Sequence, residues 1–200
     1  AVDNTLCDNL FFEDGSPVLP MPSTYYTLAG DKIKYNGDHW GNVEVQLTDA
    51  FFADEKALNN NYVIPVVMKK QTGADRILTG TPLIEGDAPA RPNSDYWSVL
   101  PQDYVLYCVK YMNPWQASYL RRGIDQITEN GSVTTVVRHA ETIEKDEVCS
   151  LDTRSLTTSV FTVNTKSTDG TTLACDLLLT FNDAGECSIT TETSGMTASG

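Results

Sequence analysis

The stretch from Gly41 to Met68 constrains the fold more than any other part of the sequence. Residues 43–48 alternate between apolar and polar, a period of two that places one face of a β-strand against a core. A second β-rich run follows at Tyr62–Met68, where Pro65 favours an edge position or a bulge because proline removes a ladder donor. The polar loop between the runs holds two adjacent phenylalanines and a helical turn capped by Asp54. This strand, loop and strand pattern is typical of a β-sandwich.

Three hairpins are predicted in the second half of the chain. Asn130-Gly131 separates two β-type runs, and both residues tolerate the positive φ that a tight turn requires. Thr158–Lys166 and Thr171–Phe181 flank a second turn, and Asn182–Gly185 forms a third. Successive hairpins make an antiparallel meander. The predicted fold class is therefore all-β, with two antiparallel β-sandwich domains of which the second is a hairpin-rich meander.

Proline and glycine mark the predicted domain boundary. The region from Thr79 to Asn93 has three prolines and no periodicity, so residues 81–97 are predicted to be a linker or long crossing loop. Residues 1–80 then form the first domain, which is expected to lack its first strands. Residues 98–200 form the second domain, which is expected to be cut short at its end.

Charge and cysteine content restrict the possible partners. Acidic residues outnumber basic ones 27 to 14, and the net charge of −13 repels phosphate backbones, which argues against nucleic acid as a partner. The five cysteines include no C-x-x-C pair and there are two histidines, so no metal site and no cofactor are predicted. Cys175 and Cys187 lie on predicted neighbouring strands and can form a disulfide if they face each other.

An aromatic cluster between residues 96 and 119 gives the one chemical indication of a ligand. Pyranose rings present apolar C–H faces that stack on flat aromatic rings, while neighbouring amides and guanidinium groups bond the hydroxyls. Trp97 and Trp115 stand beside loop residues and are the expected stacking platform. The predicted carbohydrate-binding residues are Trp97, Trp115, Tyr119, Asn113, Gln116 and Arg121.

The same residues have plainer interpretations. Tyr107 and Tyr111 alternate with valines and fit one face of a strand packed in a core. The two arginines at 121 and 122 can pair with nearby acids such as Asp125 or Glu129 instead of binding an acidic sugar. Four acids between residues 141 and 147 form the densest acidic set, but such a run is usually a solvated loop. No nucleophile motif accompanies them, so the chain is predicted not to be an enzyme.

Several segments resemble one family of bacterial surface proteins. The first group is similar to the adhesin-like, immunoglobulin-type domain of unknown function near the start of many Bacteroidetes surface lipoproteins. Its segments are VDNTL (Val2–Leu6), VLPMPSTYYTLAGDKI (Val18–Ile33), VEVQLTDAFFADEKAL (Val43–Leu58) and YVIPVVM (Tyr62–Met68). Asp103–Asp125 and Val136–Val148 are similar to the second uncharacterised domain that often follows it.

This resemblance implies an immunoglobulin-like first domain and an extracytoplasmic location, at the outer-membrane surface or in the periplasm. It implies membrane attachment through a lipid anchor outside this chain, and involvement with glycans. It supplies no catalytic residue. The expected function is therefore adhesion or glycan binding by an exported, non-catalytic surface protein, with a polysaccharide or other outer-membrane surface proteins as partners. A structural spacer or assembly subunit is the alternative, and a glycoside hydrolase or its accessory is the third.

Overall fold

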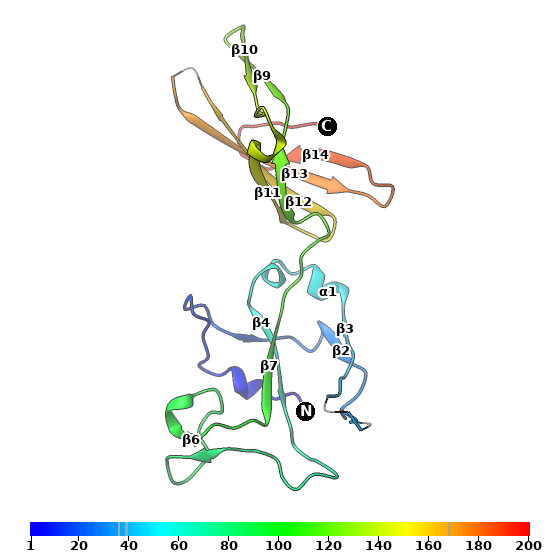
Figure 1. The fold of residues 1–200 in the computed structure, drawn as a ribbon, viewed down its shortest axis with the longest axis vertical. Helices are drawn as coiled ribbons and strands as arrows, with labels where there is room; N and C mark the ends of the chain where they lie inside the picture. Colours follow the sequence, from blue (N-terminus) through cyan, green and yellow to red (C-terminus); the bar gives the residue numbers. More distant parts are fainter. Residues whose placement is uncertain (36, 39, 168) are drawn as a thin grey trace. The chain divides into compact units, whose positions relative to one another are not determined.

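The computed structural model describes residues 1–35, 37–38, 40–167 and 169–200. It consists of β-strands joined by loops and short helical turns, so the all-β prediction is confirmed (Figure 1). Contacts divide the chain into two compact units, Ala1–Tyr111 and Met112–Gly200. Within the described ranges, no helix has the length and apolar character needed to cross a membrane.

The first unit is organised around a three-stranded sheet of order β1–β4–β7, in which β1 is parallel and β7 antiparallel to β4. Figure 1 shows β4 and β7 side by side at its centre. Two-stranded sheets are formed by β2 with β3 and by β5 with β6. The elements are η1 (Asn4–Cys7), β1 (Leu19–Pro20), β2 (Tyr26–Leu28), β3 (Val45–Leu47), α1 (Asp49–Phe52), η2 (Glu55–Leu58), β4 (Tyr62–Val67), β5 (Thr81–Pro82), η3 (Ser94–Tyr96), β6 (Trp97–Val99) and β7 (Tyr104–Val109).

Both faces of β4 are buried, because α1 and η2 cover one face and the region around η1 covers the other. Phe51 of α1 is fully buried, which explains the adjacent phenylalanines in the sequence. The predicted cap is confirmed, since an oxygen of Asp54 accepts from the backbone N–H of Lys56 at the start of η2. The main core cluster comprises Met21, Tyr26, Phe51, Ala57, Tyr62 and Ile64.

Pro65 lies in the middle strand of this sheet, so the prediction of an edge position is wrong. Its carbonyl accepts from the backbone N–H of Asp3 at 3.0 Å, on the side of β4 opposite β7. Because the N–H and C=O of one strand residue point to the same side, the nitrogen of Pro65 also points away from β7. A proline is tolerated there because it removes no bond between β4 and β7.

The division between units lies later in the sequence than the predicted boundaries at residues 80 and 98. Strand β7, predicted to begin the second domain, pairs with β4 along six residues and so belongs to the first unit. The predicted linker 81–97 contains β5, η3 and the start of β6. Proline and glycine mark a break in the local sequence, but the pairing of two strands far apart in the chain leaves no such local mark. The sequence therefore indicated a boundary at the proline-rich segment and not after β7.

Asp54 also joins two tyrosines of the first unit. One carboxylate oxygen accepts from the Tyr62 hydroxyl at 2.6 Å and from the Tyr25 hydroxyl at 2.9 Å. The bonds from Tyr62, the Lys56 N–H and Tyr25 favour the charged carboxylate and lower the pKa of Asp54. The pKa of the Tyr62 hydroxyl is raised, because burial and the neighbouring carboxylate disfavour its ionised form.

This arrangement predicts an acid-sensitive contribution to stability. A carboxyl whose pKa is lower in the folded than in the unfolded state stabilises the fold fully above the unfolded value of about 3.9. That contribution is lost as the pH falls towards the lowered folded pKa. We expect Asp54→Asn to reduce this loss in urea unfolding between about pH 7 and about pH 3. Asp31→Asn, at an exposed loop residue, is the control and should lose as much stability between these two pH values as the wild type. If Asp54→Asn lost as much stability at acid pH as the wild type, the Asp54 carboxylate would not be the source of this contribution.

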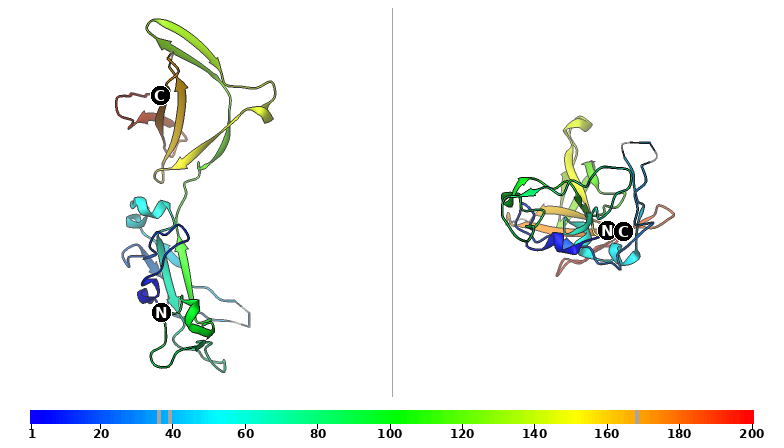
Figure 2. Two further views of the ribbon diagram at one scale, coloured as in Figure 1. Left: turned by 90° about the vertical axis from the view of Figure 1, so that its left-hand side faces the viewer. Right: turned by 90° about the horizontal axis from the view of Figure 1, so that it is seen from below.

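The second unit contains a five-stranded antiparallel sheet of order β14–β13–β12–β11–β8 and a separate hairpin, β9 with β10. The hairpin extends past one end of the sheet in Figure 1 and in the left view of Figure 2. The elements are β8 (Ala117–Arg121), β9 (Ile124–Glu129), β10 (Ser132–Val137), η4 (Ile143–Lys145), β11 (Glu147–Thr153), β12 (Thr158–Lys166), β13 (Thr172–Phe181) and β14 (Cys187–Thr191).

All three predicted hairpins are present in this unit. Asn130 and Gly131 have φ values of 49° and 80°, as the tight turn requires. The turn between β12 and β13 includes residue 168, which lies outside the described residues. The condition for a disulfide between Cys175 and Cys187 is not met, because Cys187 lies opposite Phe181, and both cysteines are free.

Candidate functional site

One face of the five-stranded sheet carries the predicted aromatic residues of the second unit. Residues directly opposite one another share a face, and so do residues two apart on a strand. Tyr119 pairs with Cys149, Thr153 with Ser159, and Ser159 with Leu179. This register places the following side chains on one face, here called the aromatic face: Tyr119, Arg121, Leu151, Phe161, Leu177, Leu179 and Phe181.

Trp115 lies against this face. Its ring is stacked on that of Phe181, with centroids 4.2 Å apart and planes 8° from parallel. Both residues are half-buried, and the Tyr119 hydroxyl donates to the backbone carbonyl of Trp115 at 2.8 Å. Tyr119 itself is 40% exposed. Trp115, Tyr119 and Phe181 therefore form an aromatic surface that remains partly open to solvent.

Asn113 holds the turn that presents Trp115. Its side-chain nitrogen donates to the carbonyls of Ser155 and Thr158 and to the hydroxyl of Ser159, each at 3.0 Å. Its side-chain oxygen accepts from the backbone N–H of Trp115. Asn113 is only 4% exposed, so the prediction that it binds sugar hydroxyls directly is wrong. The amide is used within the protein and positions the tryptophan.

Gln116 is exposed and lies in the same turn. Its side-chain oxygen accepts from both the backbone N–H and the hydroxyl of Thr153, at 3.3 and 2.5 Å. These bonds fix the side chain beside Trp115 at the protein surface. Of the predicted polar ligands, Gln116 is the one that the structure places both near the aromatic surface and in contact with solvent.

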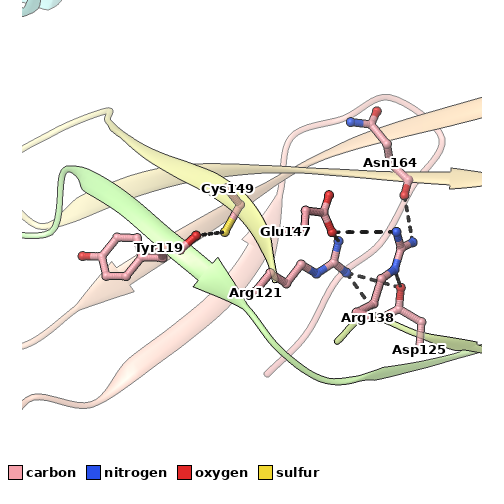
Figure 3. Close-up of polar contacts among 7 residues, drawn as sticks. All are labelled: Tyr119, Arg121, Asp125, Arg138, Glu147, Cys149 and Asn164. Atoms are coloured by element: carbon pink, nitrogen blue, oxygen red, sulfur yellow. Dashed lines mark hydrogen bonds and ion pairs between the residues drawn. The ribbon is translucent and has the colours of Figure 1, made fainter. Parts of the chain in front are cut away.

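Arg121 belongs to a charge cluster formed with Asp125, Arg138 and Glu147 (Figure 3). Arg121 lies 3.3 Å from Asp125 and 3.8 Å from Glu147, and its guanidinium lies 5.6 Å from the centre of the Phe161 ring. Arg138 approaches Asp125 to 2.7 Å and also donates to the carbonyl of Asn164. The interpretation of Arg121 as an ion-pair partner of Asp125 is confirmed.

The charge cluster connects separate strands rather than presenting a free cation. Two arginines face two carboxylates, so their formal charges cancel, and the contacts tie the β9–β10 hairpin to β8, β11 and β12. Arg122 is used similarly, because it pairs at 3.0 Å with Asp146, whose side chain is buried. Asp146 and Glu147, two members of the acidic set, are therefore committed to ion pairs.

Trp97 is placed differently from the prediction. It lies in the first unit and is only 8% exposed, so the expectation of an exposed stacking ring is wrong. Its indole N–H donates to the carbonyl of Ala90 at 3.2 Å. Close approach to Gly80 explains the burial, since a Cβ at that glycine would lie 2.9 Å from the indole ring. The proline-rich segment thus packs over the ring instead of exposing it.

Phe181 is the member of the aromatic surface that sequence reasoning missed. It ends an alternating series with Leu177 and Leu179, which would have placed it on one strand face. Tyr111, predicted as a core residue, does pack against the main core of the first unit, whereas Tyr107 is 56% exposed. The alternation was therefore the signal that could have located Phe181, although it could not indicate Trp115 as its stacking partner.

Two family models match successive parts of the chain. Residues 114–200 match a domain of unknown function, DUF5627, and residues 1–75 match a model of an N-terminal domain. A solved structure from Bacteroides ovatus, described as of unknown function, is 45% identical with a TM-score of 0.93. The match covers all of this chain and 64% of that one. No curated protein matches.

Proposed function

We propose that this chain is part of an exported, non-catalytic surface protein that binds glycans through Trp115, Tyr119 and Phe181. The observation that carries the proposal is the parallel stack of Trp115 on Phe181 in a half-exposed position. Stacking holds the indole in one orientation, so little conformational entropy is lost when a sugar ring packs beside it. Tyr119 extends the apolar area, and Gln116 provides an amide at its border.

The family context supports the cellular setting of this proposal. The likeness to a Bacteroides ovatus chain favours an origin among the Bacteroidetes. The resemblance to surface lipoproteins favours an immunoglobulin-type first domain, export, and a lipid anchor elsewhere in the protein. The expected partners are polysaccharides at the cell surface and other outer-membrane proteins. This chain spans 64% of the length of the Bacteroides ovatus chain.

Removing the indole is the direct test. We expect Trp115→Ala to weaken binding of a responsive polysaccharide by about thirtyfold, the effect of losing an anchor worth about 2 kcal/mol. The measurement is affinity electrophoresis over a panel of host and plant polysaccharides, followed by calorimetry on any that bind. Tyr119→Ala is the second variant and should weaken the same interaction.

Trp40→Ala is the matched control. Trp40 is 69% exposed in the first unit, so its loss removes an equally large ring without touching the aromatic surface. Near-ultraviolet circular dichroism verifies that each variant is folded. Equal binding by wild type and Trp115→Ala, or failure of every polysaccharide in the panel, would reject the proposal.

A structural spacer or assembly role is the second candidate. The observation that favours it is an exposed strand edge in the first unit, at β7. Such edges recruit additional strands, and the glycan panel separates the two functions because a spacer binds no sugar.

A further inference from the structure

Strand β7 forms an open edge of the sheet in the first unit. In the order β1–β4–β7 it has a neighbouring strand on one side only, among the residues that the structure describes. It runs for six residues, Tyr104–Val109, with the sequence YVLYCV. That sequence contains no proline, glycine or charge, the features with which natural edge strands avoid pairing with other chains.

The orientation of Pro65 identifies which backbone groups of β7 face outward. Pro65 pairs with Leu106, and its own backbone points away from β7 towards Asp3. In an antiparallel pair, residues opposite each other either exchange two hydrogen bonds or both point outward. Leu106 therefore presents its N–H and C=O at the open edge, and so do Tyr104 and Cys108. No backbone hydrogen bond reaches these three residues from elsewhere in the described chain.

A hollow of about 410 Å³ lies beside the same edge. Tyr104 and Leu106, two of the outward-facing residues, form part of its wall together with Leu100 and Pro101. Arg91 also lines it, but its guanidinium is held by Asp103 at 3.0 Å. When an extended segment adds to a sheet edge, backbone bonds provide affinity and pockets accept alternate side chains. Ser94 and Gln102 add polar groups to the wall, so the hollow has room for one side chain of an added strand without being purely apolar.

Apolar surface next to the edge also lacks a cover. Val105 is 48% exposed and Tyr107 is 56% exposed, although both lie on a strand of the main sheet. A second copy of this chain would bring two bodies of charge −13 together, which disfavours an edge-to-edge dimer. The matched Bacteroides ovatus chain, by contrast, has 36% of its length (100 − 64) outside the match.

We infer that an extended β-strand from the corresponding further part of the same polypeptide, outside residues 1–200, adds to β7. It pairs with the outward groups of Tyr104, Leu106 and Cys108 and places one side chain in the hollow. The inference is independent of glycan binding, because it concerns the first unit alone.

Amide hydrogen exchange of the 200-residue chain and of a polypeptide extended at both ends is the test. We expect the amides of Tyr104, Leu106 and Cys108 to exchange about 100-fold more slowly in the extended polypeptide, as for other sheet amides. The inward amides of Val105 and Tyr107 provide the reference within the same strand. Equal exchange of the outward amides in both proteins would overturn the inference. Protection that disappears on dilution would also overturn it, since a second copy would then be the occupant.

Two proline variants sharpen this test. Cys108→Pro removes an outward donor, so it should lower the melting temperature of the extended polypeptide more than that of the 200-residue chain. Val109→Pro removes a donor to β4 and should destabilise both proteins equally. A Cys108→Pro effect of the same size in both proteins would contradict the added strand.

Discussion

Replacing Phe51 by alanine is expected to destabilise the first unit by about 4 kcal/mol, within the range of about 3–5 kcal/mol for buried phenylalanines. Phe51 has no exposed surface, and its ring makes edge contacts with Tyr25, Phe52 and Tyr111 at centroid distances of 6.2, 5.3 and 6.0 Å. Truncation removes these contacts and leaves a cavity beneath α1 that the surrounding strands cannot close. Because small domains are stable by only about 5–15 kcal/mol, this loss removes a large part of the stability of the first unit.

Hydrogen exchange separates the effect on each unit. Amides of β4 should lose protection in Phe51→Ala, whereas those of β12 in the second unit should keep it. Phe11→Ala is the control, because Phe11 is 60% exposed and its loss should cost less than about 0.5 kcal/mol. Similar effects of the two variants would show that Phe51 is not the centre of this core.

Local chemistry explains why the hairpins could be predicted and the unit boundary could not. The Asn130-Gly131 turn requires positive φ at both residues, and few other dipeptides supply it, so the sequence itself indicates the turn. Pairing of β7 with β4 depends on the complementarity of two distant apolar runs. The prolines between these two runs are typical of a linker, but in the structure this proline-rich segment packs against Trp97.

The candidate site was predicted only in part, because some of its contacts are local in the sequence and others join distant residues. Residue type suggested that Trp115, which stands beside loop residues, lies near a surface, and its ring is half-buried in the structure. It could not reveal that Asn113 is buried, because the groups that bury it lie more than 40 residues later, at the turn between β11 and β12. Arg121 pairs with an acid four residues away, and this short-range pairing was visible in the sequence.

Asn113→Ala is expected to have the second largest effect, a loss of about 3 kcal/mol in the stability of the second unit. The substitution leaves the carbonyl of Ser155 and the buried hydroxyl of Ser159 without the Asn113 donor, and it frees the N–H of Trp115. The carbonyl of Thr158 keeps the backbone N–H groups of Arg154 and Ser155 as donors. Unsatisfied buried groups cost about 1–3 kcal/mol each, although partial access of water reduces their sum.

The positioning role of Asn113 also links this loss to binding. Without its bonds, the Trp115 turn is no longer fixed against the strand ends, so the stack on Phe181 should loosen and glycan affinity should fall together with stability. Gln116→Ala removes an amide from the same turn, but an exposed one, and should cost less than about 1 kcal/mol. Urea unfolding followed by tryptophan fluorescence measures both variants. A Gln116→Ala loss as large as that of Asn113→Ala would mean that burial of the amide does not decide the stability of the turn.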